Sequence, residues 1–524
     1  MKKIINILSI TLLLAVSSCT DLDLQPLSTT TPEVFFSDES AYKAFIARVY
    51  AGLAVTGQQG PAGNSDITSL DEGFSNYIRQ YWQLQELPTE EAVLAWGDAG
   101  IPDLHNHTWT SDNQFIRAIY YRIFYQVSIA NEFLRETTDA KLDERKVSDA
   151  TRTQIQAYRA EARFLRALSY WHAIDFFGDV PFYTEESGIG SSAPDQAARA
   201  TVFEFIEKEL AEIEPNMVAA GANDYGRADR AALWMLQAKL YLNGEVYAGK
   251  SYYNQCVEAC KKIINSGAFS LQENYANLFL ADNNTSPEII FAVPFDGENT
   301  QGYGGTTYLV HASVGGSMDP NNFGIDGGWS GLRTTKALPD LFPDVTGAVD
   351  KRALFYTTGQ NKEIAAITNF NDGYAVRKYR NVTSDGIPGS DKVFADTDYP
   401  MFRLADAYLM YAEAVLRGGA GGDRATALAY INQLRTRAYG NNSGNITDAQ
   451  LTLDFILNER GRELYWEGHR RTDLIRYKRF TENGIWPWKG GVPAGKTTEA
   501  FRNVYPFPAS EILANPKLKQ NQGY

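Results

Sequence analysis

Apolar side chains recur at helical spacing along most of the chain, and this pattern limits what the chain can fold into. In one clear case Phe164, Leu168 and Trp171 are separated by four and three residues, and Gly178 ends the pattern. Such a stripe must be buried against another element, because one face of the helix is apolar along its whole length. The sequence therefore predicts a mostly helical protein in which helices pack on helices.

Several of these segments follow one another across short turns. Residues 229–242 precede residues 252–264, and residues 402–416 precede residues 424–437. Helix pairs of this length are typical of tetratricopeptide-like units, which stack side by side. At 524 residues the chain is long enough for several domains or for one large helical array. We expect an all-α fold in which such helix pairs form a scaffold.

The helical pattern fades in the middle of the chain, where glycine, asparagine, aspartate and threonine become frequent. The Gly-rich part of this passage carries Tyr303 and Trp329. Long irregular segments inside compact proteins are usually functional. We expect residues 286–400 to be a loop-rich insertion, between a helical scaffold of residues 41–285 that carries ligand-binding loops and residues 401–524, which continue the same scaffold.

The N-terminus has the features of an export signal. Two lysines precede an apolar run, residues 4–16, that is too short to span a bilayer, so residues 1–18 are predicted to be a signal peptide. The small residues before Cys19 resemble a bacterial lipobox, which implies that Cys19 is lipidated and becomes the mature N-terminus. Residues 19–40 would then be a lipidated tether and the lipid the only membrane anchor. An ordinary signal peptide with an incidental Cys19 is the alternative.

The charge and the aromatic content restrict the ligand. A formal net charge of −14 argues against a nucleic-acid partner, which would need a basic face. Aromatic residues make up 13% of the chain, including 30 tyrosines and 9 tryptophans. Many must be core residues, but a ring face can also stack on the apolar C–H face of a sugar.

The remaining cysteines and the paired histidines do not predict a metal site. Cys256 and Cys260 are four residues apart in a helical segment, which does not suit a disulfide, so we expect two small buried side chains. His105 and His107 could share a metal ion or a sugar hydroxyl, but without a third ligand a structural role is favoured. No metal ion or cofactor is predicted.

Clustered acidic residues offer no clear catalytic pair. Glu459 and Glu463 are four residues apart with arginines between them, and a functional interpretation would make them an acid and a base. Each has a cation within helical reach, so an ion network that packs helices together is favoured. Asp175 and Asp179, beside Gly178, are expected to be helix caps. No catalytic residue is predicted.

Five separated segments resemble the SusD/RagB family and occur in the order seen there. The resemblance covers nearly the whole chain. It implies an all-helical fold with tetratricopeptide-like units, a surface lipoprotein, and a partner transporter of the TonB-dependent barrel type. The segments are AEARFLRALSYWHAIDFFGDVPFY, GRADRAALWMLQAKLYLNGEVYAG, FRLADAYLMYAEAVLRGG, LNERGRELYWEGHRRTDLIRY and VYPFPASEILANPKLKQNQGY.

The chain is more similar still to the starch-binding members of the family, in GLAVTGQQG, SDITSLDEGFSNYIRQYWQLQELPTEEAVLAW and YGGTTYLV. In those relatives an arc of aromatic side chains lies against the curved face of a maltooligosaccharide. Carried over position by position, the arc would be Trp96, Tyr303 and Trp329. Asp71 and Arg79 would be the hydrogen-bonding partners.

One position departs from the relatives. They have an asparagine shortly after the first tryptophan, whereas this chain is one residue shorter there and offers Asp98 in its place. Neutral sugars present no charge, so affinity requires ring stacking together with hydrogen bonds from guanidinium and carboxylate groups.

The resemblance implies a non-enzymatic, lipid-anchored protein of the outer-membrane surface. It would capture starch or maltooligosaccharides and deliver them to a TonB-dependent transporter of the SusC type. Three alternatives remain. The same scaffold could bind a different neutral glycan, the chain could be a helical scaffold that binds only protein, or it could be a glycoside hydrolase, which needs two carboxylates about 5 to 9.5 Å apart.

Overall fold

The computed structural model describes residues 32–57, 60–61, 65–68, 70–188 and 193–524. The expected signal peptide, Cys19 and most of the expected tether lie outside these residues, so lipidation stays a prediction. Within the described residues no helix is both long and apolar enough to cross a membrane.

The described chain is mostly helical, and the all-α prediction is confirmed. In chain order the helices are α2 (Pro32–Phe35), α3 (Ser40–Ala54), α4 (Tyr77–Glu86), α5 (Ile101–Asn106), α6 (Gln114–Glu136), α7 (Asp139–Glu144), α8 (Asp149–Phe177), α9 (Arg199–Ile213), α10 (Arg230–Leu242), α11 (Gly244–Ala248), α12 (Tyr253–Asn265), α13 (Gly305–Ala312), α14 (Leu404–Leu416), α15 (Arg424–Tyr439), α16 (Leu453–Leu464), α17 (Arg470–Arg476) and α18 (Ala509–Ala514).

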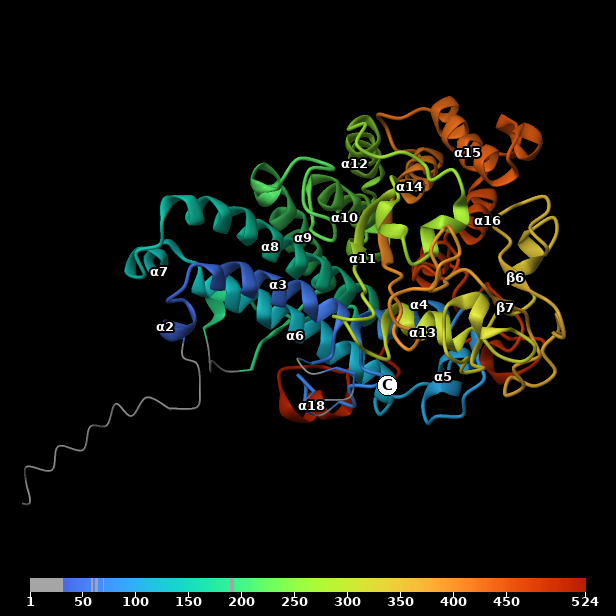
Figure 1. The fold of residues 1–524 in the computed structure, drawn as a ribbon, viewed down its shortest axis with the longest axis horizontal. Coiled ribbons are helices and arrows are strands. Elements are labelled where there is room, and N and C mark those ends of the chain that lie inside the picture. Colours follow the sequence, from blue (N-terminus) through green and yellow to red (C-terminus); the bar gives the residue numbers. More distant parts are fainter. Residues whose placement is uncertain (1–31, 58–59, 62–64, 69, 189–192) are drawn as a thin grey trace, which may run out of the picture.

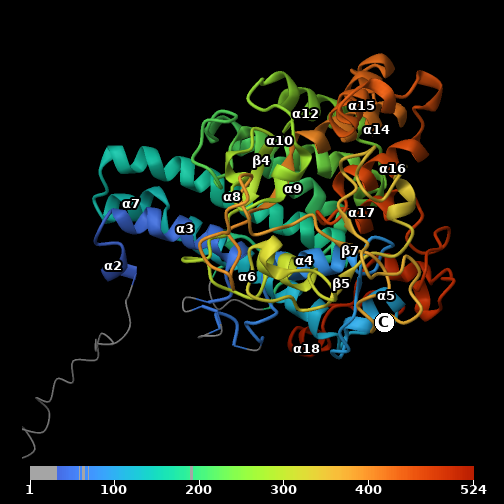
Figure 2. The same ribbon diagram turned by 45° about the vertical axis from the view of Figure 1, so that its right-hand side comes forward.

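The long helices pack as the apolar stripes predict. Helices α3, α6 and α8 lie side by side at one end of the molecule (Figures 1 and 2). Phe164, Leu168 and Trp171 are all buried on α8, and the helix ends at Gly178, whose φ of 74° is a conformation that glycine adopts without strain.

The two expected helix pairs form and stack on each other. Helix α10 packs on α12, α14 packs on α15, and α12 joins the pairs by packing on α14 (Figure 1). An aspartate caps the first helix of one pair and the second helix of the other. Asp229 accepts a hydrogen bond from Ala232 N at 3.0 Å, and Asp423 accepts one from Thr426 N at 2.8 Å. The scaffold thus has tetratricopeptide-like character.

In the described part of the chain the strands form four two-stranded antiparallel pairs. They are β1 (Val93–Leu94) with β5 (Leu332–Arg333), β2 (Val180–Pro181) with β3 (Gln196–Ala197), β4 (Ile289–Val293) with β8 (Tyr399–Arg403), and β6 (Phe355–Tyr356) with β7 (Ala375–Val376).

The β4–β8 pair joins the two ends of the passage between residues 286 and 400. Ile289 pairs with Arg403 and Val293 with Tyr399, so the chain leaves and re-enters the scaffold at one place. The passage between them is mainly irregular, with short strands. However, Gly305–Ala312 form the buried helix α13 inside the Gly-rich part that we expected to be a loop.

The acidic residues of α16 form the expected ion network. Arg352 Nη1 donates to Glu459 Oε1 at 2.9 Å and to Glu463 Oε2 at 3.0 Å, and all three side chains are fully buried. Arg403 adds a bond to Glu463 at 2.7 Å. Fully paired buried carboxylates with these partners hold helices together, which confirms the structural interpretation.

The prediction that Asp175 caps a helix is wrong. Asp175 lies at the C-terminal end of α8, where the helix dipole disfavours a carboxylate. It accepts instead from Arg471 at 3.0 Å and from the Tyr247 hydroxyl at 2.7 Å. Asp179 does meet a helix N-terminus, because it accepts from Arg199 N, the first residue of α9, at 2.8 Å.

The two cysteines on α12 are confirmed as buried side chains. Cys256 and Cys260 are both free and fully buried. They pack as small apolar groups in the contact between α12 and its neighbours.

We expect the buried pairing of Glu413 to make the free energy of unfolding depend on pH in acid. Burial raises the pKa of Glu413, but the charges of Arg476 and Arg417 outweigh this effect and lower the pKa from 4.5 to about 2. A carboxyl group with a lowered folded pKa stabilises the fold above its unfolded pKa, and this contribution is lost as the pH falls through the folded pKa. Glu413→Gln should therefore cost about 3 kcal/mol at pH 7, and progressively less as the pH falls from 4.5 to 2.

Urea denaturation of both proteins at a series of pH values measures this difference. Glu482→Gln, at an exposed position, is the matched control and should change the free energy of unfolding little at any pH. A difference between the wild type and Glu413→Gln that is as large at pH 2 as at pH 7 would contradict the assignment.

Candidate functional site

One asparagine joins the three helices that support the predicted arc. Asn76 Oδ1 accepts from Arg79 N, which caps α4, and from Gly305 N, the first residue of α13, both at 3.0 Å. Its Nδ2 donates to Ala54 O, at the end of α3, at 2.6 Å. Because these groups are buried, a single side chain fixes how α3, α4 and α13 meet.

The β1–β5 pair brings the two tryptophans together. Trp96 follows β1 and Trp329 precedes β5, so the antiparallel register places them near each other although they are far apart in the chain. Ala95 N extends the pairing by donating to Gly331 O at 2.9 Å. Trp96 Nε1 donates to Trp329 O at 3.1 Å, and the ring centroids are 6.3 Å apart.

Helix α13 positions the other two rings from its opposite ends. At its C-terminal end, Trp329 N donates to His311 O at 2.8 Å and the Trp329 ring stacks on the His311 ring at 4.8 Å. Tyr303 lies just before the N-terminal end, with its ring centroid 6.3 Å from that of Trp329 and 5.6 Å from that of Phe394.

The structure therefore brings Trp96, Trp329 and Tyr303 into one aromatic cluster. Each ring is partly buried and partly exposed, so the cluster is supported from beneath and reachable from solvent. A partly exposed row of rings is suited to stacking on a ligand with flat apolar faces.

Arg79 lies beneath the aromatic cluster. It is only 8% exposed, and its Nη1 donates to Gly73 O at 3.1 Å and to Tyr303 O at 3.0 Å. Its guanidinium lies 4.3 Å from the centroid of Tyr308 and 5.9 Å from that of Trp96, which are cation–π distances. Arg79 thus holds the loop before α13 and supports two rings. Its predicted bond to a ligand hydroxyl stays a prediction.

The two predicted carboxylates lie at the exposed edge of the site. Asp71 and Asp98 are both exposed, and Asp71 Oδ1 accepts from Gly73 N at 2.8 Å. Burial lowers the pKa of Arg79, and the charges of Tyr308, Asp98 and Asp71 oppose this effect. Both carboxylates are therefore close enough to interact with Arg79 while remaining available to a ligand.

Sequence reasoning missed the residues that support the rings. Tyr308 and His311 lie three residues apart on α13 and pack under Trp96 and Trp329 respectively. Burial lowers the pKa of His311, so the ring is neutral at pH 7, and its Nδ1 lies 2.7 Å from Gly327 O. Their helical spacing could have identified them, but the surrounding glycines obscured the helix.

The paired histidines belong to the interior. His105 and His107 are both buried, and His107 contacts Pro88 O at 2.7 Å and Thr498 Oγ1 at 3.0 Å through its two ring nitrogens. Burial lowers the pKa of His105 to about 4 and that of His107 to about 3. In the described part of the chain no three metal-ligating side chains come together.

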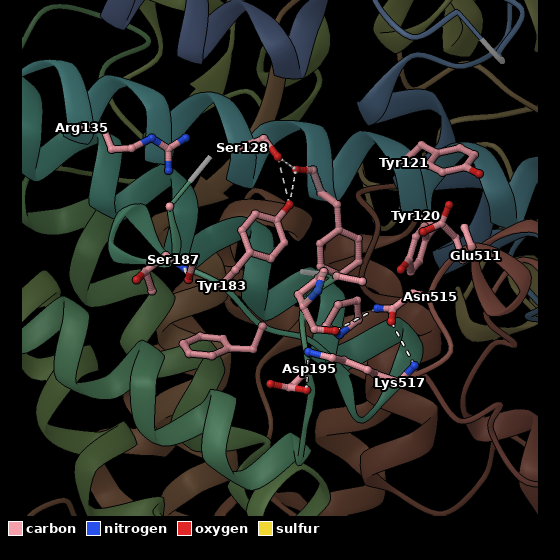
Figure 3. Close-up of a pocket in the computed structure, with 18 residues that line it drawn as sticks. Tyr120, Tyr121, Ser128, Arg135, Tyr183, Ser187, Asp195, Glu511, Asn515 and Lys517 are labelled. Carbon is pink, nitrogen blue, oxygen red and sulfur yellow. Dashed lines mark hydrogen bonds and ion pairs between the residues drawn. The ribbon is translucent and has the colours of Figure 1, made fainter. Parts of the chain in front are cut away.

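The aromatic cluster lies at the surface, because each of its rings is partly exposed. A cavity of about 630 Å³ lies elsewhere, between α6, the segment after β2, and α18 (Figure 3). Trp96, Trp329 and Tyr303 do not line it. Polymeric ligands suit surface sites, because a chain can enter and leave without threading its ends.

Known proteins resemble this chain over nearly its full length. A family model described as the SusD family matches residues 351–524, and another, described as starch-binding and associating with the outer membrane, matches residues 66–242. The starch-binding protein SusD of Bacteroides thetaiotaomicron is 36% identical over 97% of this chain and 96% of its own length. SusD-like protein P25 of Formosa agariphila is 26% identical over 97% of each chain.

Solved structures share the fold. A SusD superfamily protein from Parabacteroides distasonis has a TM-score of 0.72 at 23% identity, covering 93% of this chain and 99% of that one. Surface glycan-binding protein A from Bacteroides thetaiotaomicron, solved in complex with laminarihexaose, has a TM-score of 0.69 at 20% identity and covers 92% and 98%.

A test of the site geometry uses two glycines near Trp96. A Cβ at Gly331 would lie 2.8 Å from Trp96 Cε2 and from Leu94 Cδ1, so Gly331→Ala has to displace the indole. We expect it to lower the free energy of unfolding by about 1–2 kcal/mol and to change the near-UV circular dichroism of the indoles. A Cβ at Gly97 meets nothing within 4 Å, so Gly97→Ala should change neither. Equal spectra for both variants would disprove the packing of Trp96 on Gly331.

Proposed function

Because this chain belongs to the SusD family, we propose that it is a cell-surface glycan-binding protein that captures starch or maltooligosaccharides. It delivers them to a TonB-dependent outer-membrane transporter of the SusC type. The observation that carries the proposal is the aromatic cluster, in which three rings from distant parts of the chain share one partly exposed surface.

The chemistry of the aromatic cluster fits a neutral glycan. Trp96, Trp329 and Tyr303 offer ring faces to the C–H faces of successive sugars. Asp71 and Asp98 accept hydrogen bonds from hydroxyl groups at the edge, and Arg79 donates from beneath. The name of the relative that is 36% identical favours starch among neutral glycans. Another neutral glycan on the same scaffold is the alternative.

The buried acidic groups support binding without catalysis. Burial raises the pKa of Glu86 to about 7, a value that would suit a general acid. However, Glu86 is fully buried and its Oε1 accepts from Gly468 N at 2.7 Å, so a sugar cannot reach it. Asp398, whose pKa burial raises to about 6, is likewise buried and accepts from Tyr225. We therefore propose that the protein is not a glycoside hydrolase.

The proposed location is the outer-membrane surface, with lipid at Cys19 as the anchor. The described chain begins at α2, which lies at the end of the molecule formed by α3, α7 and α8 (Figure 1). Helix α13, which positions Tyr303 and Trp329 at its two ends, lies in the other half (Figure 1). A tether attached at α2 would leave the aromatic cluster free to meet a glycan and a transporter.

Replacing either tryptophan should weaken glycan binding. Trp96→Ala and Trp329→Ala each remove a stacking surface, and we expect each to reduce the binding free energy for maltoheptaose by about 1–3 kcal/mol. Isothermal titration calorimetry measures the change. Trp234→Ala is the matched control, because Trp234 is a partly buried tryptophan on α10, bonded to Glu214. Unchanged affinity in both cluster variants would refute the binding role of the aromatic cluster.

The absence of catalysis is tested separately. The protein incubated with amylose should release no reducing ends above the buffer blank. A glycoside hydrolase needs two exposed carboxyl groups, one of them with a raised pKa, and no such pair is found among the described residues. A purified α-amylase serves as the positive control. Sustained release that disappears on heat denaturation of the protein would overturn the non-enzymatic proposal.

A further inference from the structure

A groove with aromatic walls runs along one face of α6. Two cavities, of about 630 and 380 Å³, are both lined by Tyr121, Phe124, Ser128 and Tyr183, so they adjoin across these residues. Figure 3 shows the larger one. We call this feature the α6 groove. None of its lining residues belongs to the aromatic cluster. The volumes lie within the range of about 300–1,000 Å³ that small-molecule sites occupy.

The rings of the α6 groove come from two parts of the chain. Tyr121 and Phe124 are three residues apart on α6, which places them on one helix face. Tyr183 follows β2 and stacks on Phe124, with the ring centroids 6.4 Å apart and the planes 28° apart. The main chain of Tyr183 is held by Tyr170, whose hydroxyl donates to Tyr183 O at 2.6 Å. The groove wall is therefore formed in advance.

Hydroxyl groups lie next to these rings. The Tyr183 hydroxyl donates to Phe124 O at 3.0 Å and lies 3.0 Å from Ser128 Oγ (Figure 3). The Tyr121 hydroxyl lies 3.0 Å from the hydroxyl of Ser510, which is on α18. Tyr121 and Tyr183 are partly exposed and Ser128 is exposed, so a ligand can reach both ring surface and hydroxyl groups.

Several charged groups at the α6 groove are paired with one another, and Glu511 on α18 adds a carboxylate to the lining (Figure 3). Lys517 Nζ lies 3.0 Å from Asp195 Oδ1 (Figure 3). At the other end Arg122 lies 2.7 Å from Asp66, which also meets Arg48 at 3.2 Å. An anionic ligand would be repelled by Glu511 and would have to compete with the paired carboxylates, whereas the hydroxyl groups of a neutral ligand can donate hydrogen bonds to the Glu511 carboxylate.

We propose that the α6 groove is a second carbohydrate site, which binds a short neutral oligosaccharide separately from the aromatic cluster. The proposal rests on the proposed function, because it assigns the groove the same class of ligand. Rings with adjacent hydroxyl groups and a carboxylate that can accept hydrogen bonds match a polyhydroxylated, uncharged chain. A glycan polymer that occupied both sites would be held more tightly than by either alone.

The test uses a protein whose aromatic cluster is disabled. The double variant Trp96→Ala/Trp329→Ala, titrated calorimetrically with maltoheptaose, should keep a weaker, saturable binding of one ligand per chain. Adding Tyr121→Ala, or Ser128→Met, which fills the groove from an exposed position, should weaken this remaining binding by at least about tenfold. Tyr430→Ala, which removes a partly buried tyrosine on α15, is the matched control and should leave it unchanged.

The outcomes separate this inference from the proposed function. If the wild type binds maltoheptaose and the double variant binds none, the groove proposal is overturned while the proposed function stands. Remaining binding that neither Tyr121→Ala nor Ser128→Met weakens also overturns it. If the wild type itself binds no maltoheptaose, the proposed function fails, and the groove proposal, which depends on it, fails with it. Circular dichroism of each variant verifies that it is folded.

Discussion

The buried network of guanidinium and carboxylate groups on α16 holds the irregular middle of the chain against the helical scaffold. Arg352 belongs to the passage between β4 and β8, whereas its partners Glu459 and Glu463 belong to the C-terminal helices. Removing one partner would leave a charge buried without compensation, which costs about 3–5 kcal/mol. The network also fixes the orientation of the segments that it joins, because a planar guanidinium binds carboxylates in its own plane. An irregular segment tied in this way has little freedom to shift, so Tyr303 and Trp329, which it carries, are held in place as well.

Backbone pairing and one polar side chain fix the aromatic cluster relative to this ion network. The β4–β8 pair holds together the two ends of the segment between residues 286 and 400. The β1–β5 pair places the two tryptophans opposite each other. Asn76 then fixes α13 against α4, so that Tyr303 at one end of α13 and Trp329 at the other keep a constant separation. Rings held before a ligand arrives lose little conformational entropy on binding, which favours affinity for a weakly interacting neutral sugar.

The sequence predicted the individual helices better than it predicted the contacts between residues far apart in the chain. The apolar stripes of α8 and α10 specified those helices, since such a pattern is local. Helix α13 was not predicted, because glycines flank it and tertiary contacts with Asn76 stabilise its first turn. Asp175 looked like a cap from its position beside Gly178, but its partner Arg471 lies nearly 300 residues away. The cluster of Trp96 with the other rings was expected only from resemblance, since no local pattern encodes a contact between distant segments.

Many of the charged side chains lie in the interior of the protein and are paired there. In the interior, arginines such as Arg403 and Arg476 meet carboxylates at 2.6–2.8 Å, so many charged side chains hold the fold together and do not face a ligand. A net charge of −14 does not attract a neutral glycan from a distance, so the proposed binding would depend on direct contact alone. Contact with an uncharged chain depends on matched ring surface and hydrogen bonds. A second aromatic surface on the same molecule would therefore increase the affinity for a glycan in proportion to the length of glycan that it contacts. Long-range electrostatic attraction could not have this effect on an uncharged chain.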